Sequence, residues 1–337
     1  MLRVKVSTSF PHWSLERQTP SASGVWGNFQ FLVDREVEEC EYWVVFEGLT
    51  RTETAFCPPA NTLLVTGEPP DVKSYRAEFL GQFAAVITCQ RNLSHPRLIF
   101  SQQGLPWMIG VDLDHRTMTW SNFMSFAELE RRTPAKTKLL SVVATKDATV
   151  PGHAARNRFL HQLKDALRDQ LDVYGVGFQP IRNKWDAIAP YRYHLAIENS
   201  RIADYWTEKL ADAFLGEALP IYWGCPNIAD YFSERALEVV DIEASEAAVE
   251  QIREILRADL HGQRIAEIAR AKHQVLYQYN FFAFVSRTLD SLSMAPDAPR
   301  VRLSLHPEDL RSGAAAEVPF IRRLGGAVAR RFLRSLA

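Results

Sequence analysis

The sequence predicts an α/β protein built from two Rossmann-like domains that face one another, with a helical C-terminal extension. The first observation is size: a chain of 337 residues with 47% hydrophobic and 23% charged residues is globular, and it is too long for one ordinary core. The second is that β-rich runs alternate with turns or helices, a pattern typical of parallel sheets. The third is that this pattern stops and begins again near residue 135.

The first half contains short apolar runs that end in polar, glycine or proline residues, and each of them predicts a strand. The runs are LRVKVST (2–8), EYWVVFEGL (41–49), NTLLVTGEPP (61–70) and FAAVITCQRNL (83–93). A charged helical segment, SFAELERR, then precedes Thr133 and Pro134. We therefore place the first domain at residues 1–134.

The second half begins again with the strand LLSVVAT (139–145), a helix over 153–169 and the strand LDVYG (171–175). Further strands are predicted at Tyr191–Ile197 and within PIYWG (220–224). From about Ser245 the apolar residues recur three and four apart, which predicts helices that cap the second domain or return to brace the first. The second domain is placed at 135–293, and its ligand is expected beyond the carboxyl ends of the strands.

Residues 294–337 form a predicted tail that ends in IRRLGGAVARRFLRSLA, with five arginines and no acid. Val328, Phe332 and Leu336 recur every four residues, which predicts a basic amphipathic helix. Such a helix lies on an anionic membrane, or it is a solvated or interdomain helix. The sequence has no apolar run of membrane-spanning length and no signal-peptide pattern, so we predict a cytoplasmic protein with optional peripheral contact to the inner face of the membrane.

Charge and cysteine usage exclude two further classes. The 39 basic and 40 acidic residues give a net charge of -1, which argues against a nucleic-acid partner. The four cysteines match no CxxC metal site and no disulfide framework, so we interpret them as reduced thiols. Cys225 lies between Gly224 and Pro226, where a packing or turn role is favoured over that of a nucleophile.

The segment 191–224, YRYHLAIENSRIADYWTEKLADAFLGEALPIYWG, carries the densest set of reactive groups. Its strand ends in Glu198, Asn199 and Ser200, and a helix is predicted from an N-cap at Asp204 to a stop at Gly216.

On the predicted helix, Tyr205 is a neighbour of Glu208 and Lys209, at a free helix N-terminus with its positive dipole end. This combination predicts a site for a phosphorylated ligand, with Lys209 on the phosphate, Glu208 on ribose hydroxyls and Tyr205 stacking or hydrogen bonding. The alternative is a solvated helix face with an ordinary Glu/Lys pair.

The strings HLAIENS, DYWTEKL and ALPIYWGCPNIADYF resemble the signature region of glycosyltransferase family 10, the α-1,3/4-fucosyltransferases. LLSVVAT followed by HAARNRFL, then VYGVGF, and TGEPP near residue 67 extend this resemblance to residues 20–290 or so. The resemblance implies a GT-B type fold, with GDP-fucose bound by the C-terminal domain and the acceptor approaching from the N-terminal one. It places these residues at donor-binding positions: Arg156, Asn199, Tyr205, Glu208 and Lys209. Arg158 competes with Arg156, because the motif is short and allows a slip of two residues.

An inverting transfer requires a base for the acceptor hydroxyl and positive groups for the departing diphosphate. Glu68 follows a β-branched strand and a glycine, and it resembles the catalytic glutamate of bacterial relatives. The two prolines directly after it depart from some relatives, which leaves a structural Glu68 and Glu198 as alternatives.

For the diphosphate, Arg156, Lys209 and the helix N-terminus supply positive charge without a metal. The DxD spacing at Asp112 and Asp114 looks like a strand-end turn, so we expect no metal and no cofactor.

These observations predict an inverting glycosyltransferase that moves fucose from GDP-fucose to O3 of GlcNAc or glucose in a cell-surface glycan, such as a lipopolysaccharide side chain. Two alternatives remain open: a non-catalytic nucleotide- or glycan-binding protein of the same fold, and a transferase that uses another GDP-sugar. The donor rests on family analogy. Acceptor specificity is expected in the loops 8–28 and 67–76.

Overall fold

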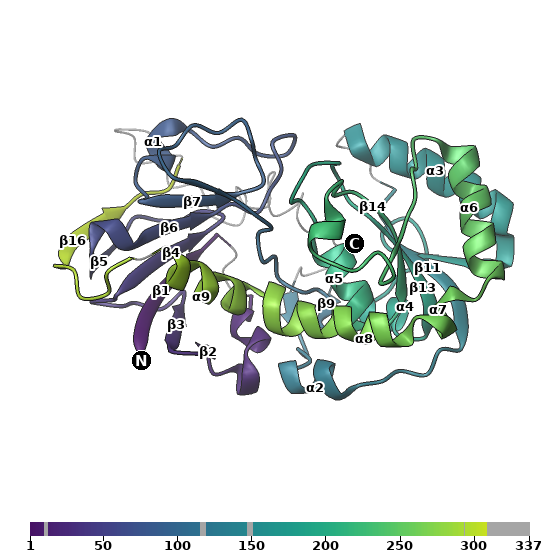
Figure 1. Ribbon diagram of the computed structural model, residues 1–337, viewed down its shortest axis with the longest axis horizontal. Coiled ribbons are helices and arrows are strands. Elements are labelled where there is room, and N and C mark those ends of the chain that lie inside the picture. The colour runs from purple at the N-terminus through teal and green to yellow at the C-terminus, as the bar shows by residue number, and fades with distance from the viewer. Residues whose placement is uncertain (10–12, 115–118, 147–150, 293, 309–337) are drawn as a thin grey trace.

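The computed structural model describes residues 1–9, 13–114, 119–146, 151–292 and 294–308, and it shows two lobes that each contain a largely parallel sheet (Figure 1). In the described residues the first sheet has the strand order β2-β3-β1-β4-β6-β7-β8, and the second has the order β12-β11-β13-β14-β15. The predicted fold class, two facing Rossmann-like α/β domains of GT-B type, is confirmed.

All four strands predicted in the first half are present: β1 (Leu2–Thr8), β4 (Tyr42–Phe46), β6 (Thr62–Val65) and β7 (Ala85–Thr88). They pair in parallel, with β4 between β1 and β6. Every residue of β4 and β6 is buried, because both faces of the sheet are covered.

Several short strands of the first half of the chain were missed by the prediction, because two or three residues carry little periodic signal. They are β2 (Val25–Trp26), β8 (Leu98–Phe100), β9 (Asp112–Asp114) and β10 (Thr119–Ser121). β3 (Phe29–Val33) was also missed, although its buried residues alternate as a strand requires. Helices are sparse in the described part of residues 1–134, namely α1 (Ala77–Leu80) and α2 (Phe126–Arg131), together with 3₁₀ turns.

The second lobe confirms the predicted alternation of strands and helices. Its elements are β11 (Lys138–Val143), α3 (Pro151–Leu167), β12 (Leu171–Tyr174), α4 (Lys184–Ile188), β13 (Tyr191–Ile197), α5 (Glu208–Leu215), β14 (Leu219–Trp223), β15 (Glu238–Val239), α6 (Ser245–Arg257), α7 (Leu260–Gln263) and α8 (Ile265–Gln274). One face of the sheet packs against apolar residues of α3 and α6, and the other packs against α5 and α8. The parallel strands therefore end at a common edge from which the following loops reach the first lobe.

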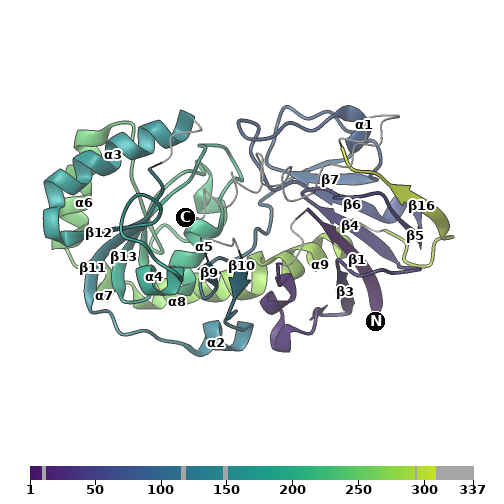
Figure 2. The same ribbon diagram turned by 180° about the vertical axis from the view of Figure 1, so that it is seen from behind.

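The helical segment predicted after residue 264 is broken. Its first part, α8, runs into a π-helical turn, Val275–Tyr279 (η6), and α9 (Phe281–Ser291) starts after Asn280, whose side chain accepts a hydrogen bond from the N–H of Ala283 at 3.0 Å. Phe281 and Phe282 pack in the core of the first sheet. The two roles predicted for these helices therefore both occur, since α8 covers the second domain and α9 packs against the first (Figure 2).

The domain limits 1–134, 135–293 and 294–337 stay a prediction. In the structure α9 adds to the first core, and β16 (Val301–Leu305), in the predicted tail, pairs antiparallel with β5 (Glu53–Cys57). The predicted amphipathic helix at the end of the tail lies outside the described residues. Within the described part of the chain, no helix is long and apolar enough to cross a membrane.

Candidate active site

The predicted ligand-binding segment begins where β13 ends, at the edge of the second sheet. Glu198, Asn199 and Ser200 follow directly and are all buried. A loop then leads to α5, so these polar groups and the start of the helix lie beside one another at the carboxyl edge of the strands.

Helix α5 begins later than predicted, at Glu208, with Thr207 as its N-cap. The predicted cap, Asp204, has a φ of 64°, a left-handed conformation that does not lead directly into a helix. Tyr205 therefore lies in the preceding loop, and its predicted i, i+3 and i, i+4 contacts on one helix face were wrong. The predicted stop at Gly216 is confirmed.

Glu198 organises the start of this helix. Its carboxylate accepts hydrogen bonds from the N–H of Thr207 at 2.8 Å and from the Thr207 hydroxyl at 2.7 Å. Both oxygens are thereby engaged within the second domain. The geometry favours this structural role of Glu198 over that of the base, for which the sequence had left Glu198 as an alternative to Glu68.

Lys209 is held by two buried carboxylates. Its Nζ lies 3.1 Å from Oε1 of Glu208 and 3.6 Å from Oε2 of Glu198. Burial by itself lowers the pKa of Lys209, but the charges of Glu208 and Glu198 outweigh it and raise that pKa. Conversely, burial raises the pKa of Glu208, but the charges of Lys209 and Lys184 hold that pKa below its usual value. The ammonium and carboxylate predicted to bind the donor are therefore both ionised and pre-oriented.

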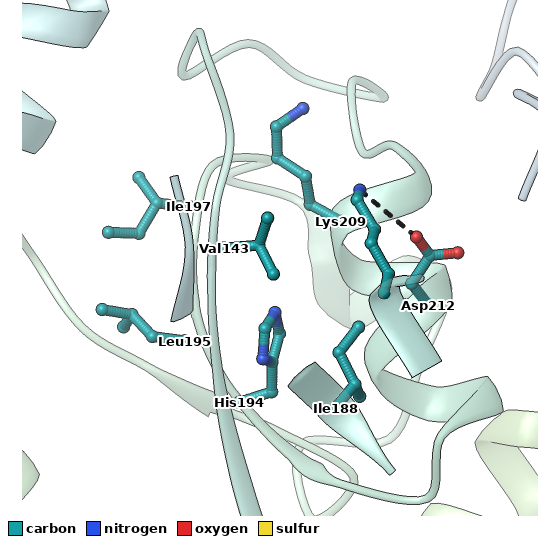
Figure 3. A pocket seen from close by; sticks show the side chains of 8 residues that line it. Val143, Ile188, His194, Leu195, Ile197, Lys209 and Asp212 are labelled. Carbon is teal, nitrogen blue, oxygen red and sulfur yellow. Dashed lines mark hydrogen bonds and ion pairs between the residues drawn. The ribbon is translucent and has the colours of Figure 1, made fainter. Parts of the chain in front are cut away.

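A small pocket lies beneath this cluster, between α4, α5 and the sheet (Figure 3). Lys209, His194 and Asp212 are among its lining residues. Lys184 lines it as well, and its Nζ lies 3.4 Å from Oδ2 of Asp212. Burial and the charges of Lys184 and Lys136 lower the pKa of His194 to about 3, and its Nδ1 lies 2.9 Å from the Ser141 hydroxyl. His194 is therefore a satisfied core histidine.

Arg156 enters the site from α3 and is 3% exposed, whereas Arg158 is exposed. Nη1 of Arg156 donates to Oδ1 of Asn199 at 3.3 Å, while Nε and Nη2 of Arg156 are buried with no hydrogen-bond partner among the described residues. Each unsatisfied buried donor costs about 1–3 kcal/mol. A guanidinium held in this way is suited to an anionic ligand that would satisfy both nitrogens.

Glu68 approaches this cluster from the first domain, three residues after β6. Burial, followed by the negative charge of Glu47, raises its pKa to about 8, while Lys209 acts in the opposite direction across the domain junction. A carboxylate with a raised pKa is a stronger base than an ordinary glutamate. The structure therefore brings Glu68 within the electrostatic reach of the predicted donor-binding residues.

Direct contacts join the same two edges. The hydroxyl of Ser200 donates to Oδ2 of Asp71 at 3.2 Å, and Arg91 pairs with Asp204. The side chain of Gln103 also donates to the backbone oxygen of Asp204, at 3.2 Å. The loops that carry Glu68 and Tyr205 are thus held against one another.

Aromatic packing holds the Tyr205 loop from the other side. Trp206, predicted on the helix, precedes it and makes edge contacts with Tyr231, Phe232 and Tyr279. Tyr205 itself is 2% exposed. The loop that carries Tyr205 is therefore also held by aromatic packing at its next residue.

The DxD spacing is no strand-end turn, which corrects the prediction: Asp112 and Asp114 lie in β9. The carboxylate of Asp112 bonds the side chains of Asn122, Asn183 and Arg182. In the described residues no group of three His, Cys, Asp or Glu side chains could hold a metal ion. Transfer without a metal stays a prediction.

The four cysteines, all within the described residues, are buried and form no disulfide there, and their reduced state stays a prediction. Burial raises the pKa of Cys225 to about 12, and the backbone N–H of this residue bonds the Tyr222 hydroxyl. A role in packing and turn formation is confirmed for it.

The sequence reasoning missed two buried charged residues next to the site, Glu47 and Lys184. It placed Asp212 on the same helix face as Glu208, which lies four residues earlier, but assigned Asp212 no role. Glu47 and Lys184 had no usable signal, since their partners are distant in sequence.

Two facing Rossmann-like domains with largely parallel sheets define the fold class as GT-B, and Glu68 of one domain lies near the buried cationic cluster of the other. Residues 133–259 match the model of "Glycosyltransferase family 10 (fucosyltransferase) C-term". The resemblance to glycosyltransferase family 10 that the sequence predicted is therefore confirmed over residues 133–259.

Curated relatives match over the same part of the chain. An α-(1,3)-fucosyltransferase FucT from Helicobacter pylori is 31% identical over 127 residues, which cover 36% of this chain and 25% of that protein. The α-(1,3)-fucosyltransferase 4 of Mus musculus is 40% identical over 84 residues, which cover 23% of this chain and 19% of that protein. The matches thus span a quarter or less of these relatives' length.

Solved structures align with most of the chain at low identity and with TM-scores below 0.5. A crystal structure of an α1,3-fucosyltransferase has a TM-score of 0.48 and 17% identity, over 86% of this chain and 89% of that one. WaaG, a glycosyltransferase involved in lipopolysaccharide biosynthesis, has a TM-score of 0.42 and 14% identity, over 87% of this chain and 100% of that one.

Proposed function

We propose that the protein is an inverting fucosyltransferase that moves fucose from GDP-fucose to a hydroxyl of a glycan acceptor, with Glu68 as the base. The observation that carries this proposal is the position of Glu68, whose carboxyl is influenced by Lys209 and Glu208 of the opposite domain. A base and a phosphate-binding cluster on opposing domains are the two requirements of an inverting transfer.

In the proposed reaction Glu68 takes the proton from the acceptor hydroxyl, whose oxygen attacks the anomeric carbon of the sugar. The bond from that carbon to the β-phosphate oxygen breaks, and the electron pair leaves with GDP. Arg156 has two buried nitrogens without partners and is the residue best suited to bind the diphosphate. Lys209 adds positive charge, although Glu198 and Glu208 already neutralise much of it.

The remaining donor contacts are assigned by position. Asn199 orients Arg156 through its amide oxygen, and Tyr205 lies between the domains, where Glu68 and Glu198 both raise the pKa of its hydroxyl after burial. Glu208 is the carboxylate assigned to sugar or ribose hydroxyls. Fucose as the transferred sugar is supported by the fucosyltransferase family match and by the curated relatives.

The acceptor is proposed to be O3 of GlcNAc or glucose in a cell-surface glycan, with no metal required at the diphosphate. Purified full-length protein should transfer labelled fucose from GDP-fucose to members of an oligosaccharide panel, with and without EDTA. Turnover with another GDP-sugar alone would remove fucose from the proposal. Tight GDP binding without transfer to any acceptor would instead establish a non-catalytic nucleotide-binding protein.

Glu68→Gln tests the base. We expect a fall in kcat of at least a hundredfold with little change in GDP affinity, since general-base catalysis contributes about 10²–10⁴-fold. Glu78→Gln is a matched control, because Glu78 is an exposed glutamate of the same domain. Full transfer by Glu68→Gln would show that Glu68 is not the base.

A further inference from the structure

Glu47 is a fully buried carboxylate that directly follows β4, and sequence reasoning assigned it no role. Its φ of 66° is left-handed, which is uncommon for a residue other than glycine. Such a conformation persists only where the surrounding contacts hold it, and it is frequent near functional sites. The contacts of Glu47 therefore show what this position is built to do.

The hydrogen bonds and the ion pair of the Glu47 side chain in the described structure go to the loop 67–75, which carries Glu68. Oε2 accepts the N–H of Gly67, next to Glu68, and the hydroxyl of Tyr75 at 2.8 Å. Lys73 Nζ lies 2.9 Å from Oε1 and donates to the Glu47 carbonyl oxygen at 2.7 Å. One carboxylate thus binds the beginning, the middle and the end of this loop.

We propose that Glu47 is the positioning residue for Glu68: it grips the loop that carries the base and places a negative charge beside it. This inference rests on the proposed function for its catalytic consequence. Glu47 makes no contact with a reacting atom, so it acts through Glu68.

The same loop is also held by an uncharged residue, Gln90. This helps to separate the effect of Glu47 on the position of the loop from the effect of its charge on Glu68. Gln90 donates to the backbone oxygens of Glu68 at 2.8 Å and of Lys73 at 2.9 Å, so the loop is also fastened to the end of β7. An amide at position 47 can keep part of the hydrogen bonding without the charge. Replacing Glu47 by glutamine therefore tests mainly the electrostatic contribution.

Several charged or titratable groups face Glu68, and Glu47 is one of two that favour its protonated form. Burial raises the pKa of Glu68 first, then Glu47 and the more weakly acting Glu208 raise it, while Lys209 and Lys73 lower it. The neighbouring neutral groups are Tyr75 of the same loop, Cys89 after β7 and Tyr205 of the second domain. Removing the charge of Glu47 should lower the pKa of Glu68, and removing that of Lys73 should raise it as long as Glu47 stays ionised.

The experiment is a pH titration of Glu68 by ¹³C NMR in full-length protein with carboxyl-labelled glutamate, the signal being assigned by its loss in Glu68→Gln. In Glu47→Gln we expect the Glu68 midpoint to fall by about one pH unit. In Lys73→Met it should rise. The acidic limb of kcat/KM for fucose transfer should move in the same two directions.

Glu53→Gln is the matched control, because Glu53 also pairs with one lysine, Lys5, at 2.7 Å and accepts one hydroxyl, that of Ser7, at 2.8 Å. It is not among the groups that shift Glu68, so its variant should leave the midpoint unchanged. If Glu47→Gln does not fold, Lys73→Met still tests the direction in which a charge on this loop moves the Glu68 midpoint.

An unchanged Glu68 midpoint in Glu47→Gln, or a Lys73→Met midpoint that does not rise, would overturn the inference. Because the NMR titration does not depend on turnover, its result stands whether or not the protein transfers fucose. If the midpoints move but wild-type protein shows no transfer, the proposed function fails while the positioning of Glu68 by Glu47 holds.

Discussion

Arg91 of the first domain and Asp204 of the second form an ion pair across the junction that separates Glu68 from the predicted donor-binding residues. Asp204 is 6% exposed and is also bonded by the Tyr231 hydroxyl at 2.7 Å and the Asn227 side chain at 2.9 Å. The guanidinium of Arg91 lies over the ring of Phe100, 3.8 Å from its centroid. The pair thereby fixes the loop between Ser200 and Thr207 to the first domain.

Arg91→Ala should raise the KM for GDP-fucose several-fold, because the loop that carries Tyr205 loses its tie to the first domain. Its effect on stability should be below about 1 kcal/mol, since the Arg91 side chain is 47% exposed and solvent screens the pair. Steady-state kinetics and urea unfolding measure the two effects. Arg51→Ala, which removes an exposed pair with Glu36, is the control and should leave KM unchanged. An unchanged KM in Arg91→Ala as well would show that the pair does not position the donor site.

Arg156→Ala should weaken GDP binding roughly ten- to hundredfold, because a hydrogen bond to a charged group contributes about 1.5–3 kcal/mol. Arg158→Ala should bind GDP as wild type does, since its side chain is exposed on the same helix. Isothermal titration calorimetry of both variants distinguishes the two residues. The opposite ranking would mean that the donor motif is shifted by two residues.

Gly67→Ala should reduce transfer and destabilise the fold by about 1–3 kcal/mol through overpacking. A methyl group on Gly67 would lie 2.7 Å from Oε2 of Glu47 and 3.2 Å from Cδ2 of Leu105, so the carboxylate that holds the loop must move. Gly48→Ala is the control, because its nearest contacts, Lys73 and Ser9, lie at 3.8 and 3.9 Å. Thermal unfolding and kcat are the measurements, and equal effects in both variants would count against a specific role of the contact with Glu47.

The stability of the protein should fall between pH 6.5 and 3 partly because of His194. Its folded-state pKa of about 3 lies below the unfolded value of 6.5, so the unfolded state binds the extra proton in this window. The contribution of His194 is complete above pH 6.5 and is lost as the pH falls, by at most about 1.4 kcal/mol per pH unit. In His194→Gln this contribution is absent, so its stability deficit relative to wild type should shrink from pH 7 to pH 5 in urea unfolding. His161→Gln, at an exposed site, should follow wild type throughout.

The strands were predictable where each apolar run is bounded by turn residues. β13 and the helix stop at Gly216 occur where the sequence placed them. The start of α5 was not predictable from the helical spacing of Trp206, Leu210 and Phe214. Glu198, at the end of the preceding strand, fixes the turn by bonding Thr207, and local periodicity carries no information about that bond.

The prediction of a continuous helical segment after residue 264 fails for a similar reason. Its apolar spacing continues through Tyr277, but the chain must leave the second core and reach the first. The π-helical turn and the cap by Asn280 accomplish this change of direction. Only the position of two separate cores requires it, so a one-dimensional pattern does not contain it.

By itself, the sequence determined that the chain alternates strands and helices in two units, and that the residues Asn199, Tyr205, Glu208 and Lys209 follow one strand in a family-specific order. Only the tertiary structure decided that Glu68 faces them, that Arg156 rather than Arg158 is buried beside Asn199, and that Glu47 holds the Glu68 loop. Local propensity and periodicity depend on neighbours within a few residues. Burial, electrostatic influence and contacts between residues more than twenty positions apart depend on how the strands are ordered and on how the two domains meet.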